Sequence, residues 1–230
     1  MPDPRDTALL SSCPTLAAPR FGTLPDMGNG QRVIVAANGV FLQVRLDWLD
    51  CTLCIARLNS APPLPYGLMQ EHIAFAFGVI PVALLREFVE AGRDGLPNEI
   101  AGGLIYTRKT GRLRLQVYEA LQASANGIDY RMPPLAQDET LAVDLHTHGR
   151  VAAFWSATDD RDDLGIKVAG VFGHLDRARP SAAFRLVANG HYLALRHPWL
   201  PADVQVTSGS ALAGGARGAI LRWLQRLRGE

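Results

Sequence analysis

The stretch that decides the fold reads Val-Asp-Leu-His-Thr-His at residues 143–148, and Ser-Ala-Thr-Asp follows at residues 156–159. Side chains two residues apart on a strand project from the same face, so a strand here places His146 and His148 side by side. Zinc binds histidine nitrogens at about 2.0–2.1 Å, and Asp159, at the start of the next helix, supplies a third ligand. A His-His-Asp set leaves the fourth tetrahedral position for water, which is the arrangement of a catalytic zinc site.

Each half of this pattern also has a structural explanation. Ser156 followed by Asp159 is a capping box, in which the serine caps a helix and the aspartate reaches back to the serine amide. Two histidines two residues apart are common on ordinary strands. The joint spacing H-x-H-x₇-S-x₂-D favours a metal site. The acidic run leaves open which aspartate binds, because it contains Asp159, Asp160, Asp162 and Asp163.

The joint spacing resembles that of the JAMM (JAB/MPN) zinc metalloprotease family, in its prokaryotic JAB form. Members of that family place a catalytic glutamate after the first helix, at the entry to an apolar, glycine-containing strand. Glu99, in LPNEIAGGLIY at residues 96–106, fits this position. The resemblance covers residues 81–195. Many members carry proline after the second histidine where this chain has Gly149, a difference that removes no ligand.

The resemblance implies a zinc-dependent isopeptidase or peptidase that cleaves at the C-terminus of a ubiquitin-like protein. One zinc ion per chain would be bound by His146, His148 and Asp159. Glu99 would be the general base toward the zinc-activated water, and Ser156 would donate a hydrogen bond to the developing oxyanion. Asp144 shares the strand face of His146 and is a candidate carboxylate for orienting a ligand histidine. A solvated or capping role for Asp144 is the open alternative.

Residues 154–163 also resemble a bacterial branch of the family that is encoded in PRTRC gene cassettes. This branch implies a ThiF-like activating protein and other small cassette members as partners, and a bacterial cytoplasmic location. The competing function is a non-catalytic scaffold or binding subunit on the same fold, since many family members have lost zinc. Those members usually lack part of the ligand set, whereas this chain has all of it.

Composition and charge exclude several other classes of protein. The 230 residues are 48% hydrophobic and 20% charged, an ordinary globular mixture that can form a core. A net charge of +1 gives no bulk attraction to nucleic acid or to an acidic membrane, so neither is expected as a partner. No apolar run reaches the ~20 residues of a membrane span. The N-terminus, with Asp3 and Asp6, lacks the apolar stretch of a secretory signal.

The cysteine pattern leaves two interpretations. Cys51 and Cys54 form a C-x-x-C, which fits a redox pair or half of a zinc site. No second C-x-x-C is present, so we favour two packing residues in a strand at residues 50–57. An odd count of three cysteines also fits a reducing compartment.

The order of elements predicts an α/β (α+β) fold, with a JAMM/MPN-like mixed, curved sheet flanked by helices. Residues 1–70 should form a β-rich extension with an irregular lead-in over 1–30 and a hairpin around Asn38-Gly39. Residues 71–205 should form the catalytic domain, with a helix that Pro81 opens, a loop over 124–139 and a short acidic helix over 156–164. Residues 206–230 should form a Gly-rich link and a basic amphipathic helix, which we expect to dock on the domain rather than on nucleic acid or a membrane.

Overall fold

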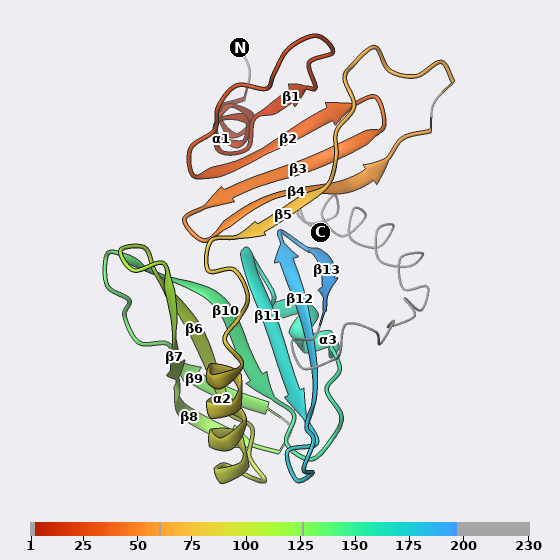
Figure 1. The fold of residues 1–230 in the computed structure, drawn as a ribbon. Helices are drawn as coiled ribbons and strands as arrows, with labels where there is room; N and C mark the ends of the chain where they lie inside the picture. Colours follow the sequence, from red (N-terminus) through yellow and green to blue (C-terminus); the bar gives the residue numbers. More distant parts are fainter. Residues whose placement is uncertain (1–2, 60, 126, 197–230) are drawn as a thin grey trace. The chain divides into compact units, whose positions relative to one another are not determined.

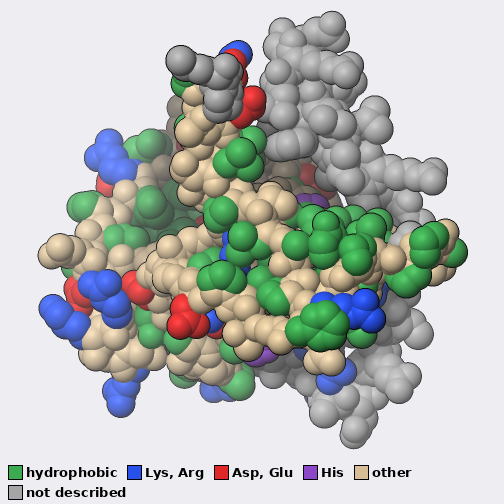
Figure 2. Space-filling view, turned by 90° about the horizontal axis from the view of Figure 1, so that it is seen from above, with side chains coloured by type: hydrophobic (Ala, Val, Ile, Leu, Met, Phe, Trp, Pro, Cys, Tyr) green, Lys and Arg blue, Asp and Glu red, His purple; other side chains and the backbone are tan. Residues whose placement is uncertain are grey.

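The computed structural model describes residues 3–59, 61–125 and 127–196, and the chain divides into two compact units, Met1–Gly78 and Val79–Glu230 (Figure 1). The link and helix predicted over residues 206–230 lie outside the described residues. Within the described part, every helix is too short or too polar to cross a membrane. On the face that Figure 2 shows, Lys and Arg side chains are interspersed with acidic and hydrophobic ones, in keeping with the net charge of +1.

The N-terminal unit contains a five-stranded sheet in the order β1-β2-β3-β4-β5. The predicted hairpin around Asn38-Gly39 is confirmed, since it joins β2 (Gly30–Ala36) to β3 (Gly39–Leu46). The next antiparallel strand is β4 (Leu49–Arg57), which carries both cysteines of the C-x-x-C. The last strand, β5 (His72–Phe75), pairs with β4, so this unit continues past residue 70 to Gly78.

The prediction of an irregular lead-in over residues 1–30 is wrong in part. Helix α1 (Pro4–Ser12) forms, because the Asp3 side chain accepts a hydrogen bond from the Arg5 amide and caps its N-terminus. Strand β1 (Thr15–Ala17) then pairs in parallel with β2. Both elements are short, and no side chain of α1 is buried, so no apolar periodicity marks them in the sequence.

The second unit contains a six-stranded mixed sheet in the order β13-β12-β11-β10-β6-β7, which confirms the predicted α+β class. Strands β10 and β11 pair in parallel, and the other pairs described in this sheet are antiparallel. A parallel pair requires a crossover connection, and α3 (Ala157–Asp162) lies within it. The strands are β6 (Ala101–Thr107), β7 (Arg112–Val117), β10 (Glu139–Thr147), β11 (Ile166–Gly173), β12 (Ser181–Ala188) and β13 (His191–Leu195).

Helix α2 (Val82–Asp94) packs on one face of this sheet, and Pro81 is its N-cap as predicted. The Phe88 ring lies 5.6 Å from that of Phe172 on β11, which in turn meets Phe184 of β12 edge-on at 5.7 Å. Gly170 is required beneath Phe184, because a Cβ at this position would lie 2.6 Å from the phenylalanine ring. The side chains of α2 that are buried in this core are Leu85, Phe88 and Val89.

A small two-stranded sheet occupies much of the region that the sequence predicts as a loop, so that prediction is wrong for residues 124–131. Strands β8 (Glu119–Ser124) and β9 (Gly127–Arg131) pair antiparallel. The rings of Tyr118 and Tyr130 stack at its base, with centroids 5.0 Å apart. All six residues of β8 are exposed, so the alternation of buried and exposed side chains that marks a strand is missing.

Candidate metal centre

The register of the second sheet sets which side chains share the face opposite α2. Thr147 of β10 points toward the helix, because its methyl group lies next to Gly92 of α2. Asp144 and His146 have the opposite parity on the strand and therefore project from the other face. His146 pairs with Ala101 of β6, and Glu99 precedes Ala101 by two residues, so Glu99 projects from the same face as His146.

Glu99 is held at this place by backbone pairing on both sides. Its amide donates to the Ser124 carbonyl of β8 at 2.8 Å. The next residue, Ile100, donates its amide to the Thr147 hydroxyl at 2.9 Å and accepts from the Thr147 amide at 3.0 Å. The glutamate is therefore fixed beside the end of β10, where His148 follows the strand.

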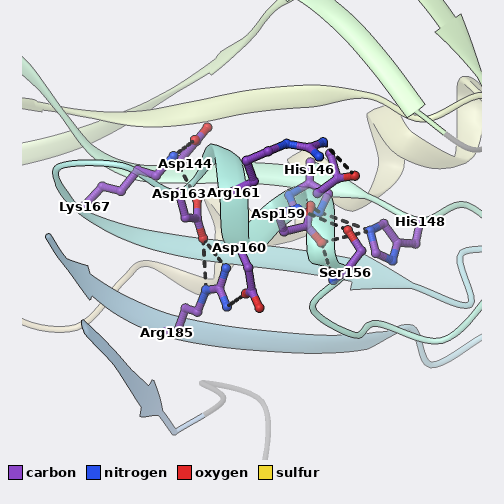
Figure 3. Close-up of polar contacts among 11 residues, drawn as sticks. Asp144, His146, His148, Ser156, Asp159, Asp160, Arg161, Asp163, Lys167 and Arg185 are labelled. Carbon is purple, nitrogen blue, oxygen red and sulfur yellow. Dashed lines mark hydrogen bonds and ion pairs between the residues drawn. The ribbon is translucent and has the colours of Figure 1, made fainter. Parts of the chain in front are cut away.

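His146, His148 and Asp159 form a group that could hold a metal ion (Figure 3). The two histidine Nε2 atoms lie 3.2 Å apart. Asp159 places Oδ1 at 3.3 Å from the His146 Nε2 and Oδ2 at 3.9 Å from the His148 Nε2. A tetrahedral ion with bonds of 2.0–2.1 Å separates its ligand atoms by about 3.3–3.4 Å. Two nitrogen donors and one carboxylate at this spacing fit a single zinc ion.

The ionisation states of His148 and Asp159 are those that metal binding requires. Burial lowers the pKa of His148, and the neighbouring His146 lowers it further, so the imidazole stays neutral. Burial acts to raise the pKa of Asp159, but hydrogen bonds from His146 and from the Ser156 amide outweigh it and hold the pKa well below its usual range. Neutral imidazole and ionised carboxylate are the forms that bind a metal ion.

Ser156 and Asp159 close a capping box at the start of α3. The Ser156 amide donates to Asp159 Oδ2 at 2.6 Å, and the Asp159 amide donates to Ser156 Oγ at 3.1 Å. The serine hydroxyl accepts in this bond and retains its own proton, because a hydroxyl is both a donor and an acceptor. Ser156 therefore keeps a donor at the edge of the site.

Glu99 lies in the same pocket as the metal-ligand group. It is 8% exposed, and burial raises its pKa to about 7; the nearby His146 opposes this rise and Asp159 adds to it. The pocket has a volume of about 390 Å³, and Ile128 and Tyr130 of β9 line it together with Phe154. A carboxyl group with a pKa near neutrality takes up and releases a proton at physiological pH, as a general base must.

The side-chain hydrogen bond of Asp144 joins it to a lysine and not to a histidine ring. Its Oδ2 accepts from Lys167 Nζ at 2.6 Å, and Lys167 also lies 3.0 Å from Asp163 Oδ1. The sequence did not lead us to predict a role for Lys167 at the site, although β11 is otherwise apolar around it. Arg185, a single charge in the apolar strand β12, was missed as well and binds Asp160 and Asp163. The signal that could have found both residues is a single charged residue inside an otherwise apolar strand.

The charges around the site leave a negative balance. Asp144, Asp160 and Asp163 pair with the cations Lys167 and Arg185, and Asp159 lies against the two histidines, so two negative charges remain when Glu99 is protonated. A divalent cation on the His-His-Asp group cancels this balance. Buried carboxylates are stable only when they are paired or bind a metal, so the charge count and the ligand spacing favour the same ion.

Two family models match the chain, one in each unit. Residues 81–187 match the prokaryotic homologues of the JAB domain. Residues 81–187 of the second unit therefore carry a JAB-type domain. Residues 3–76 match a domain of unknown function, DUF2016. All six predicted site residues line the pocket and lie within the matched residues 81–187: Glu99, Asp144, His146, His148, Ser156 and Asp159.

Comparisons with individual proteins add little to this assignment. No curated protein matches the chain at a significant level. Among solved structures, the chain is similar to the solution structure of protein DSY2949 from Desulfitobacterium hafniense, with 17% identity and a TM-score of 0.36. That match covers 50% of this chain and 86% of the other.

Proposed function

We propose that this protein is a zinc-dependent isopeptidase or peptidase that cleaves at the C-terminus of a ubiquitin-like protein. The observation that carries the proposal is the pocket in which Glu99 lies with His146, His148 and Asp159. A complete set of three ligand residues and a buried carboxyl group with a pKa near 7 are what hydrolysis by an activated water requires.

The chain's own residues have distinct tasks in this proposal. His146, His148 and Asp159 hold the zinc ion, which when bound supplies a Lewis acid and a water molecule of lowered pKa. Glu99 accepts the proton of the attacking water and passes it to the leaving amine. Ser156 donates its hydroxyl proton as a hydrogen bond to the carbonyl oxygen of the substrate as that oxygen gains negative charge.

A non-catalytic scaffold or binding subunit is the second candidate function. The observation that favours it is the separate N-terminal unit, which matches a domain model of its own, distinct from the JAB-type domain. A unit of this kind can serve binding alone. In either case we propose partners from the same bacterial gene cassette, namely a ubiquitin-like protein and a ThiF-like activating protein, and a cytoplasmic location.

The deciding experiment uses a ubiquitin-like protein from the proposed gene cassette, prepared as a tail-extended fusion and as a lysine-linked conjugate. Mass spectrometry after incubation with the zinc-loaded protein identifies the bond that is cut. Cleavage after the C-terminus of the carrier, lost on chelation and restored by zinc, supports the peptidase. If neither substrate is cut, and the carrier binds equally well with and without zinc, the scaffold function replaces it.

A further inference from the structure

We infer that Arg185 is a positioning residue of the metal centre, which holds helix α3 in place and thereby sets the Asp159 carboxylate. Arg185 lies on β12, and its register partner Ala169 is also the partner of Asp144 on β10. Its side chain therefore projects from the same sheet face as Asp144 and His146. The inference rests on the proposed function only in assigning Asp159 as a metal ligand.

Helix α3 needs an anchor that its own sequence does not contain. It has six residues, Ala157–Asp162, and none of them is buried. Isolated helices shorter than about 12–15 residues are marginal in water, so a helix of this length stays in place only through contacts with its surroundings. The hydrogen bonds and ion pairs that tie α3 and its C-cap Asp163 to the sheet come from Arg185, Lys167, Tyr192 and the two histidines.

Arg185 supplies three of these contacts, more than any other single residue (Figure 3). Its Nη1 donates to Asp160 Oδ1 at 2.6 Å, on the residue that follows the metal ligand. Its Nε and Nη2 both donate to Asp163 Oδ2, at 2.9 and 2.6 Å. One guanidinium thus binds both helix α3, at Asp160, and its C-cap, at Asp163. The candidate metal ligand Asp159 immediately precedes Asp160 in the chain.

Two aromatic rings fix the orientation of the guanidinium. Arg185 lies over the ring of Trp155 at 4.0 Å and over that of Tyr192 at 4.1 Å. Trp155 immediately precedes the cap residue Ser156, and the Tyr192 hydroxyl donates to the Asp160 carbonyl at 2.8 Å. The arginine therefore connects the chain on both sides of Asp159 to strands β12 and β13. A lysine has neither the planar face nor the forked donors to reproduce this.

The burial of Arg185 fits a fixed structural anchor. The residue is 4% exposed, and the side chain of Asp163 is 10% exposed. Without the guanidinium, Asp163 keeps only Lys167 as its described cation, and Asp160 loses its ion pair. Helix α3 then loses both links to β12, and the Asp159 carboxylate is no longer held at 3.3 Å from the His146 Nε2.

The test compares Arg185→Met and Arg185→Lys with a matched control, Arg114→Met. Arg114 forms a bidentate pair with Glu139 at the opposite end of β10, away from α3. Zinc affinity is measured by competition with a chromophoric chelator, and the ligand set by the visible spectrum of the cobalt-loaded protein. We expect Arg185→Met to weaken zinc binding about 10–100-fold and to change the cobalt spectrum, Arg185→Lys to restore little, and Arg114→Met to change neither.

Amide hydrogen exchange separates this inference from the proposed function. The amides of Asp160 and Asp163 are protected by bonds to the carbonyls of Ser156 and Asp159, so exchange at both should accelerate in Arg185→Met even without metal. If wild-type protein binds no metal, the proposed function fails while exchange still tests Arg185. Unchanged exchange, or zinc affinity equal to wild type, overturns the inference. If Arg185→Met does not fold, Tyr192→Phe, which removes one link to Asp160, is measured in the same way.

Discussion

Asp159 uses its two carboxylate oxygens for different partners, and Ser156 is the partner that holds one of them. Oδ2 accepts the Ser156 amide at 2.6 Å, while Oδ1 lies 3.3 Å from the His146 Nε2. The capping box and the metal site are therefore compatible uses of one side chain. The cap orients the aspartate, and the second oxygen remains directed at His146. An S-x-x-D pattern after two strand histidines can thus be structural and functional at once.

The first prediction concerns the metal content of variants at the proposed ligand residues. Wild-type protein should bind one zinc ion per chain, and His146→Ala and Asp159→Ala should lose it, since each removes one of three protein ligands. Asp162→Ala is the matched control, because its side chain is 68% exposed on the same helix and contacts Arg161. Elemental analysis measures the zinc. Full zinc retention in both ligand variants would contradict the site.

Glu99→Gln is predicted to bind zinc as wild type does and to lose cleavage. Glutamine keeps the size of the side chain but cannot accept a proton, so the rate should fall at least about a hundredfold. Cleavage of the tail-extended ubiquitin-like substrate is followed by mass spectrometry, with zinc content measured in the same samples. A variant that cleaves as fast as wild type would show that Glu99 is not the base.

The stability of the metal-free protein should depend on pH through Glu99. Burial raises the pKa of this group in the folded state to about 7, above its ordinary value of 4.5. A raised pKa means that the folded state binds the proton more tightly, so the contribution to stability is complete below pH 4.5 and is lost as the pH rises through 7. Metal-free Glu99→Gln should therefore melt at a higher temperature than wild type at pH 8. Calorimetry should show a smaller difference in melting temperature between the variant and wild type at pH 5 than at pH 8. An equal difference at both pH values would rule out this pKa.

Asp144→Asn should keep its zinc ion and lose stability. Its hydrogen bond goes to Lys167, so the change weakens a half-buried ion pair without disturbing a ligand. Replacing Lys167 by Met should cost more, about 3–5 kcal/mol, because it leaves the Asp144 and Asp163 carboxylates without that cation. Chemical denaturation measures both losses. Loss of zinc in Asp144→Asn alone would restore the role of a histidine-orienting carboxylate.

Cysteine variants should leave the metal content unchanged. Burial raises the pKa of Cys51 to about 11, so its thiolate is not available at neutral pH, and Cys54 packs against Phe41 in the N-terminal core. Cys51→Ser should lower the free energy of unfolding by about 1–3 kcal/mol, because it buries a hydroxyl group. Zinc content of the double variant Cys51→Ser/Cys54→Ser is the decisive measurement, and a loss of metal would reveal a second site.

Elements whose signals are local could be predicted from the amino-acid sequence. The apolar spacing of α2, the hairpin at Asn38-Gly39 and the cap at Ser156 each depend on residues within a few positions of one another. The shared direction of His146 and His148 follows from β10, which carries His146 and ends one residue before His148, so this pair of candidate ligands could be predicted from the sequence. Strands β8 and β9 could not be predicted from the sequence, because their side chains do not alternate between buried and exposed positions.

Only the tertiary structure decided which charges meet. In the acidic run, Asp159 faces the histidines, Asp160 and Asp163 bind Arg185, and Asp162 stays at the surface. The partners Lys167 and Arg185 come from strands whose pairing with β10 is set by sheet register. Asp144 likewise pairs with a lysine 23 residues away rather than with the histidine two residues away. Strand parity is local, but the pairing of charges depends on long-range register, which no short pattern of residues encodes.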